Sequence, residues 1–215
     1  YDPVWSVDGR WIYYSGTEGV REQVFARRAD AGEPPRQVVE SELNVNPSSW
    51  HRDGDRLAVY QREINDRDIA ILHTDEEPAR LEPFLTTPAN ERSPAFSPDG
   101  RWLAYASNTS GRDEIYVTDY PDRSIIRAVS TTGGREPVWD PRGGALFYRR
   151  GDEFYRVAIE DGPELRLGTP ERFASGRYTQ EMAVDSGSQS YDVAADGSLI
   201  VIQPTALDET PGVIV

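Results

Sequence analysis

Apolar and polar positions recur along this chain in one unit that is repeated five times. In each unit a short apolar stretch, a tight polar turn and a second apolar stretch follow one another. The clearest copy covers residues 93–106, and the turn glycines of the five copies stand at positions 9, 54, 100, 143 and 197, 43 to 54 residues apart. A period of this length is typical of β-propellers, in which each repeat forms one blade.

Each unit predicts an antiparallel hairpin followed by two further strands. A turn containing Asp-Gly between stretches rich in β-branched and aromatic residues is a strong signal for a hairpin. Alternating apolar and polar residues after the hairpin predict a third strand, and a more polar stretch predicts an edge strand. The third strands are expected at 23–27, 68–73, 114–118 and 153–158, and the edge strands at 36–39, 81–85, 125–129 and 164–167.

The predicted fold class is therefore all-β, a β-propeller built from four-stranded antiparallel blades, with four full repeats and one incomplete repeat. A longer polar stretch, 168–189, separates the last two hairpins and is expected to be a loop or lid. We take residues 1–215 as a single domain, with blades at approximately 1–43, 44–88, 89–132, 133–172 and 173–215.

The third copy resembles a known family. Residues 93–107 read Ser-Pro-Ala-Phe-Ser-Pro-Asp-Gly-Arg-Trp-Leu-Ala-Tyr-Ala-Ser, and residues 113–117 read Asp-Glu-Ile-Tyr-Val. This pattern resembles the WD-like repeat of bacterial TolB-type β-propellers, and the five copies extend the resemblance over almost the whole chain. The last copy resembles the closing blade of propellers in large bacterial proteins, including the extracytoplasmic part of some membrane-bound serine/threonine kinases. The resemblance implies membership of a six-bladed ring and a periplasmic or extracytoplasmic location.

Charge and composition exclude several classes of function. The chain has 37 acidic and 23 basic residues and a formal net charge of −14, which is the wrong sign for binding nucleic acid or an anionic membrane surface. Cysteine and lysine are both absent, which excludes disulfides, thiolate chemistry and Schiff-base catalysis. The longest apolar run, 199–202, is far too short for direct membrane insertion.

The usual catalytic and metal-binding patterns are missing from the sequence. There is no Gly-x-Ser-x-Gly nucleophile motif, and His51 and His73 lie in unrelated parts of their repeats, as ordinary surface or turn residues would. The aspartates of the turns are expected to cap those turns, and the five tryptophans are expected to pack in the core. We therefore expect this chain alone to be no enzyme, and to hold no metal and no cofactor.

The loops that enter the innermost strands are the best candidate for a binding surface. Chain order places them all on one face, around the mouth of the central channel, where loops from several blades converge. Arg92 and Arg135 occupy equivalent positions and could hold a carboxylate or an acidic peptide, or else pair with Glu91 and Glu136 of their own loops. The candidate partner-binding residues are Asn46, Glu91, Arg92, Arg135, Glu136, Gln189 and Tyr191.

Three functions fit this surface. The first is a non-catalytic module that binds a protein or peptide at the channel rim, as the exported sensor or scaffold part of a larger bacterial protein. The second is the substrate-gating propeller of a prolyl-oligopeptidase-like serine peptidase, which implies a hydrolase domain in the parent chain, as the first implies a possible kinase domain. The third is a propeller that binds a small ligand or calcium in its channel.

Overall fold

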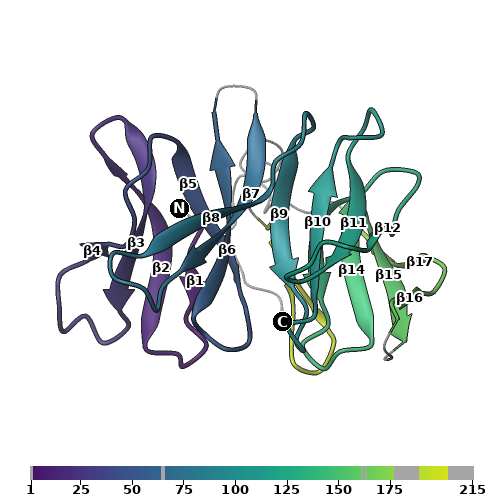
Figure 1. Ribbon diagram of the computed structural model, residues 1–215. Helices are drawn as coiled ribbons and strands as arrows, with labels where there is room; N and C mark the ends of the chain where they lie inside the picture. The colour runs from purple at the N-terminus through teal and green to yellow at the C-terminus, as the bar shows by residue number, and fades with distance from the viewer. Residues whose placement is uncertain (1, 64–65, 161, 163, 177–188, 203–215) are drawn as a thin grey trace, which may run out of the picture.

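A computed structural model describes residues 2–63, 66–160, 162, 164–176 and 189–202. These residues form three antiparallel four-stranded sheets, one five-stranded sheet and one two-stranded sheet, and no helix occurs among them (Figure 1). The strands of the first two sheets are β1 (Val4–Trp5), β2 (Trp11–Glu18), β3 (Arg21–Arg28), β4 (Arg36–Gln37), β5 (Asn44–Trp50), β6 (Arg56–Arg62), β7 (Arg67–His73) and β8 (Arg80–Leu85). The all-β prediction is confirmed for the described part of the chain.

The remaining sheets follow in the same order. Their strands are β9 (Glu91–Phe96), β10 (Trp102–Ser107), β11 (Glu114–Asp119), β12 (Ile126–Ala128), β13 (Arg135–Trp139), β14 (Ala145–Arg150), β15 (Glu153–Glu160), β16 (Arg166–Leu167), β17 (Glu171–Ser175), β18 (Tyr191–Val193) and β19 (Leu199–Val201). Every predicted third and edge strand overlaps an observed one. The segment 168–189 differs from the prediction, because β17 lies within it and pairs with β15. This strand also crosses the proposed boundary at 172, while residues 177–188 lie outside the described part.

Hydrogen bonds explain why the Asp-Gly sequences form hairpin turns. In the third sheet the Asp99 carboxylate accepts the amide proton of Arg101 at 3.1 Å and the hydroxyl proton of Ser97 at 2.6 Å. Gly100 completes the turn with a φ of 75°, which glycine adopts without steric cost. Asp8 and Asp196 make the same amide contact two residues on, as predicted, and in the fourth turn Asp140 takes over this role.

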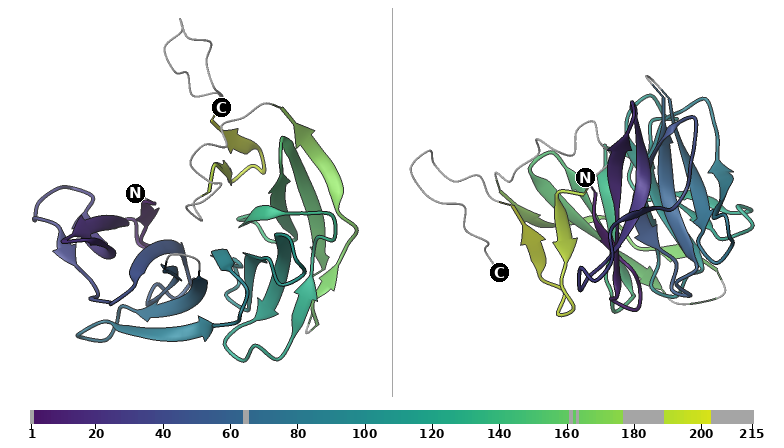
Figure 2. Two further views of the ribbon diagram at one scale, coloured as in Figure 1. Left: turned by 90° about the horizontal axis from the view of Figure 1, so that it is seen from above. Right: turned by 90° about the vertical axis from the view of Figure 1, so that its left-hand side faces the viewer.

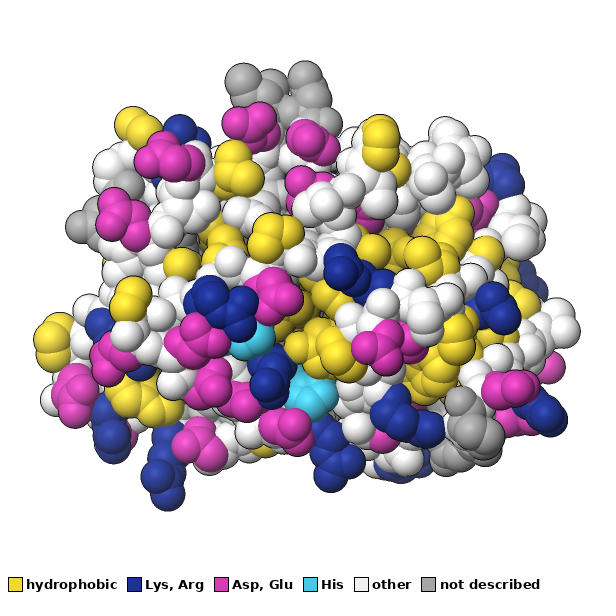
Figure 3. Space-filling view, viewed as in Figure 1, with side chains coloured by type: hydrophobic (Ala, Val, Ile, Leu, Met, Phe, Trp, Pro, Cys, Tyr) yellow, Lys and Arg dark blue, Asp and Glu magenta, His cyan; other side chains and the backbone are white. Residues whose placement is uncertain are grey.

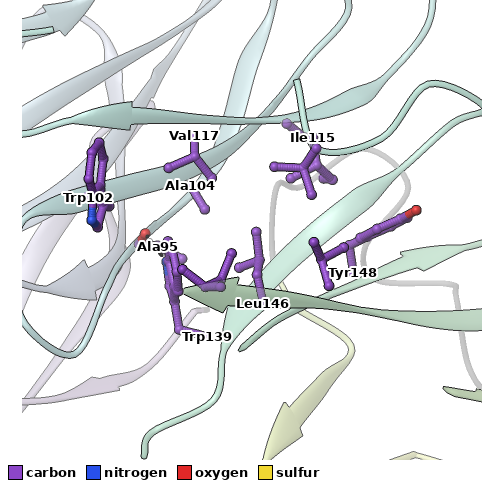
Figure 4. Close-up of a cluster of buried hydrophobic side chains, with 12 residues drawn as sticks. Ala95, Trp102, Ala104, Ile115, Val117, Trp139, Leu146 and Tyr148 are labelled. Carbon is purple, nitrogen blue, oxygen red and sulfur yellow. Dashed lines mark hydrogen bonds between the residues drawn. The ribbon is translucent and has the colours of Figure 1, made fainter. Parts of the chain in front are cut away.

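Neighbouring sheets pack face to face through small and apolar side chains. Between the third and fourth sheets, Ala104 and Val117 lie on the side of Leu146, and Ile115 lies opposite Tyr148, all of them buried (Figure 4). The indole N–H of Trp139 donates to the Ala95 carbonyl oxygen across this junction at 2.9 Å. The hydrophobic contacts fix each sheet against the next, so the loops at their ends are held on a rigid frame.

The five sheets follow one another along an arc, with the first strand of each towards the inside (Figure 2). At the two ends of the arc, apolar side chains that would be covered inside it are open to solvent. Trp5 is 59% exposed, whereas the equivalent Trp139 is 8% exposed, so the expectation that all five tryptophans are core residues is wrong for Trp5. Ile200 on the fifth sheet and Ile202 directly after it are exposed. The sheets of the described residues form an open arc and not a closed ring.

Candidate functional site

The predicted rim residues lie at equivalent places of successive sheets. Asn46, Arg92, Arg135 and Gln189 each precede a turn glycine by eight positions. The first three pair with the second strand just before a bulge, and the connections that lead into them lie at the upper end of the molecule in Figure 1. The bulge is strained in two of the sheets, since Ser93 and Glu136 have φ values of 51° and 54°.

Arg92 and Arg135 both bind one carboxylate, that of Asp113. The guanidinium of Arg92 lies 3.3 Å from one oxygen of Asp113, and Nε of Arg135 lies 2.6 Å from the other. The Asp113 side chain is 9% exposed and that of Arg92 is 11% exposed, whereas the side chain of Arg135 is 41% exposed. Two cations therefore share one anion, with Arg92 on the buried side and Arg135 at the surface.

The alternative in which these arginines pair with glutamates of their own loops is wrong for Arg135 and Glu136. Glu136 is buried, and its Oε2 accepts hydrogen bonds from the amide of Ser190 at 2.8 Å and from the Ser190 hydroxyl at 2.6 Å. The hydroxyl of Tyr191 donates to the Glu136 carbonyl oxygen at 2.7 Å, and burial raises the pKa of this tyrosine well above its ordinary value. Glu136 and Tyr191 thus join the fourth sheet to the fifth.

The other candidates also serve structural contacts. Glu91 is 2% exposed and accepts hydrogen bonds from the hydroxyl groups of Thr87 at 2.7 Å and Ser107 at 3.1 Å. Asn46 is equally buried. Gln189 is exposed, although its side-chain amide donates to the Pro137 carbonyl oxygen at 3.1 Å. Of the seven predicted residues, Arg135 and Gln189 are therefore the two with surface open to a partner.

A repeat of acidic residues explains this arrangement, and sequence reasoning missed it. Gln23, Glu114 and Glu153 occupy equivalent places near the start of the third strand and pair with the second strand. The residue directly before each of them is acidic: Glu22 in the first sheet, Asp113 in the third and Asp152 in the fourth. Glu22 accepts a hydrogen bond from the Asn46 amide of the next sheet at 3.0 Å, just as Asp113 holds Arg135 of the next sheet. An alignment of the repeats beyond their hairpins would have revealed these acids.

The second sheet breaks this rule. Arg67 stands where the other sheets have an acid, so no carboxylate at that position faces Arg92 of the third sheet. Arg92 instead binds Asp113 of its own sheet. The convergence of two arginines on one aspartate is a consequence of this single departure from the repeat.

A second polar cluster lies at the opposite end of the sheets. His51, Asp53 and Asp55 have ligand atoms within 4.8 Å of one another. These atoms already have protein partners, because the His51 ring contacts the Gly100 carbonyl oxygen and the Asp53 amide, and Asp55 pairs with Arg56 at 2.8 Å. Figure 3 shows both histidines among arginine and acidic side chains. Each is only 8% exposed, so neither is a surface residue, whereas His51 does lie at a turn as predicted, since its carbonyl oxygen accepts the Gly54 amide proton at 3.0 Å.

The fold is similar to that of proteins of known structure. No family model matches the chain. The structure of TolB from Acinetobacter baumannii covers 95% of this chain with a TM-score of 0.73 at 14% identity, over 49% of its own length. A putative TolB from Agrobacterium tumefaciens covers 92% with a TM-score of 0.67 at 18% identity, over 71% of its own length. The fold is that of TolB-type propellers.

Matches to other proteins are weaker or shorter. The Tol-Pal system protein TolB of Desulfotalea psychrophila is 38% identical over 24% of this chain, and the uncharacterized peptidase YuxL of Bacillus subtilis is 23% identical over 53% of it. The chain spans 12% and 22% of the length of these two relatives. Prolyl oligopeptidase B of Galerina marginata covers 92% of the chain, over 30% of its own length, with a TM-score of 0.57 at 13% identity. The predicted resemblance to TolB-type propellers is thus confirmed for the fold.

Within the described part of the chain there is no helix with the length and apolar character needed to cross a bilayer.

Proposed function

We propose that this TolB-type propeller is a non-catalytic binding module that holds a protein or peptide partner by a carboxylate at the channel rim. The observation that carries the proposal is the array of Arg92, Asp113 and Arg135. Asp113 forms its ion pair with Arg135 through Nε of the guanidinium. We propose that the two terminal nitrogens of the same group serve as donors for a second, external carboxylate. A planar guanidinium binds a carboxylate through paired hydrogen bonds, which fix direction as well as distance.

The rest of the molecule limits the kind of partner. The array carries a local charge of +1, on a protein whose formal net charge is −14. A strongly acidic partner would be repelled at long range, a basic one would be attracted, and a neutral one would be neither repelled nor attracted by the net charge. A partner of neutral or basic character that presents one carboxylate, such as the C-terminus of a chain, satisfies both conditions. Because Asp113 and the sheets already fix Arg135, binding loses little side-chain entropy.

A panel of basic peptides with free and amidated C-termini tests this proposal by isothermal titration calorimetry. We expect binders to prefer the free carboxylate, and Arg135→Ala to weaken them about tenfold. Arg127→Ala is the matched control, because Arg127 is an exposed arginine on the edge strand β12. Equal binding of the two peptide forms, or equal effects of the two substitutions, would refute the rim site.

A second candidate is the substrate-gating propeller of a prolyl-oligopeptidase-like peptidase. It is supported by the match to YuxL and by the likeness to prolyl oligopeptidase B. In that case a hydrolase domain carrying Gly-x-Ser-x-Gly would be encoded in the same gene, whereas a kinase domain with a membrane span would favour the sensor. The complete reading frame distinguishes the two. An exported location is part of the first proposal and is supported by the TolB-type fold.

We also infer that the four complete sheets and the two-stranded one are blades of a six-bladed ring. The solvent-exposed Trp5 and Ile200 at the two ends of the arc support this proposal, because equivalent positions inside the arc are covered by the next blade. Protection of Trp5 from iodide quenching in the full-length protein, relative to residues 1–215 alone, would test it.

A further inference from the structure

The junction between the second and third sheets departs from the repeat at the residue before Arg92. Equivalent positions hold Val45 and Gly134, and a Cβ atom on Gly134 would lie only 2.8 Å from Ile115. The third sheet has Glu91 there, 2% exposed. A carboxyl group therefore stands where the second and fourth sheets have an apolar or minimal side chain.

A second carboxyl group, Asp68 on β7, faces the same junction. Two of its equivalents, Gln23 and Glu114, hold the connection to the next sheet. Gln23 donates to the carbonyl oxygens of Ser41 and Leu43, and Glu114 accepts the amide proton of Gly133 at 2.9 Å. Within the described residues, Oδ1 of Asp68 and Oε2 of Glu91 are both closed to solvent and accept no hydrogen bond.

An ionised oxygen in that position is unfavourable. Burying a carboxylate without a donor costs more than burying a neutral polar group, and two such groups in one junction repel each other. The charged and titratable groups on the surrounding strands are Asp68 and Arg67 on β7, Arg62 on β6, Arg92 on β9, Tyr105 on β10, and Asp113 before β11. Arg62 and Arg92 are held by Glu22 and Asp113.

A proton is the ligand that removes this cost in the space available. A metal ion or an ammonium group needs a cavity with a path to solvent, whereas the two oxygens are enclosed. We propose that Glu91 is a proton-binding site of the folded protein, and that its ionisation beside Asp68 weakens the junction between the second and third blades. This proposal is independent of the rim function, although Glu91 directly precedes Arg92.

The electrostatic balance agrees with the geometry. Burial raises the pKa of Glu91 above its ordinary value of 4.5, the hydrogen bonds from Thr87 and Ser107 oppose this shift, and the charge of Asp68 adds to it. Burial also raises the pKa of Asp68, and the nearby Asp66 adds to that shift. A carboxyl whose pKa is higher in the folded state makes the protein more stable as the pH falls towards 4.5, and less stable as the pH rises through the folded pKa.

Thermal unfolding of wild type and Glu91→Gln between pH 5 and pH 8 tests the proposal. We expect the variant to melt about 2–4 °C above wild type at pH 8, with the difference shrinking towards pH 5, because glutamine mimics the protonated acid. Glu114→Gln is the matched control. Burial alone would raise the pKa of Glu114, but hydrogen bonds from Ser130, Arg112 and the Gly133 amide outweigh it, so this variant should melt below wild type at pH 8.

A Glu91→Gln variant that melts below wild type by a constant amount at every pH would overturn the proposal. Carbon-13 NMR titration of the Glu91 carboxyl provides a reading that does not depend on that variant. We expect a pKa above 4.5 in wild type and a lower one in Asp68→Asn, which removes the repelling charge. A wild-type pKa at or below 4.5, or no response to Asp68→Asn, would also overturn it.

Discussion

Nε2 of His51 lies 3.2 Å from the carbonyl oxygen of Gly100, so the hairpin turn of the second blade touches that of the third. Nδ1 of the same ring accepts the Asp53 amide proton at 3.3 Å, which leaves Nε2 as the protonated nitrogen that donates to Gly100. The ring also packs edge-on against Phe96, with 5.1 Å between the ring centroids. A turn that looks purely local in the sequence is thus part of the contact between blades.

Replacing Gly100 with alanine should destabilise the protein through this contact. Gly100 has a φ of 75°, and a Cβ atom there would lie 2.4 Å from Nε2 of His51. We expect Gly100→Ala to lower the free energy of unfolding by about 2–4 kcal/mol. Gly9→Ala is the control, because Gly9 has a similar φ of 67° but open space around it, and it should lose only about 1 kcal/mol. Urea denaturation measures both, and equal losses would contradict a role for the contact.

The hydrogen bond between Trp139 and the Ala95 carbonyl predicts a difference between two tryptophans at equivalent positions. Trp139→Phe keeps most of the buried ring but leaves the carbonyl oxygen without its donor, so we expect a loss of about 1–2 kcal/mol. Trp5→Phe should be nearly neutral, because Trp5 is 59% exposed. Chemical denaturation of the two variants checks this; a comparable loss at Trp5 would mean that the ends of the arc are packed in solution.

Much of the fold could be predicted from sequence because the signals are local. Glycine at positive φ and aspartate bonding the amide two residues on determine the turn at Gly100 within a few residues. The strand β17 could not be found this way, since its residues 171–175 are mostly exposed and polar and form a strand only because β15 offers a free edge. The exposure of Trp5 depends on which sheet is its neighbour, which its own repeat does not reveal.

The candidate site was predictable as a place but not as a set of contacts. Counting eight residues back from each turn glycine finds Arg92 and Arg135. The carboxylate that binds them, Asp113, belongs to a different strand, and Arg92 reaches it only because Arg67 replaces an acid in the preceding blade. Such pairings are set by the packing of blades, so the sequence left the choice between Glu91, Glu136 and an external ligand open.

Asp113→Asn should weaken both the rim array and the fold. The substitution removes the charge that two guanidinium groups share and leaves Arg92, whose side chain is 11% exposed, beside an amide. Breaking a largely buried ion pair lowers the free energy of unfolding by about 2–4 kcal/mol. Most of this loss comes from the pair with Arg92, because solvent screens the pair with the more exposed Arg135. Asp30→Asn, which breaks an exposed pair with Arg28, is the control and should have little effect. Equal midpoints of urea denaturation for Asp113→Asn and wild type would contradict this account.

The turn of the fourth blade predicts a pH dependence of opposite sign to that of Glu91. Asp140 is 3% exposed, and its carboxylate receives paired hydrogen bonds from Arg142 at 2.9 and 2.8 Å. These bonds, opposed by burial and reinforced by the Arg142 amide, hold the pKa of Asp140 below its ordinary value of 3.8.

A carboxyl with a lowered folded pKa stabilises the protein above its ordinary pKa, and this stabilisation is lost as the pH falls through the folded value. Asp140→Asn should therefore melt below wild type at pH 7, and the difference should shrink once the pH falls below 3.8. Asp122→Asn, at an exposed turn position, controls for the substitution itself.

Since Arg142 also donates to the Asp196 carbonyl oxygen of the fifth blade at 2.8 Å, hydrogen exchange of the Leu199–Val201 amides should accelerate in Asp140→Asn. Unchanged exchange there would show that Arg142 holds the fifth blade without help from Asp140.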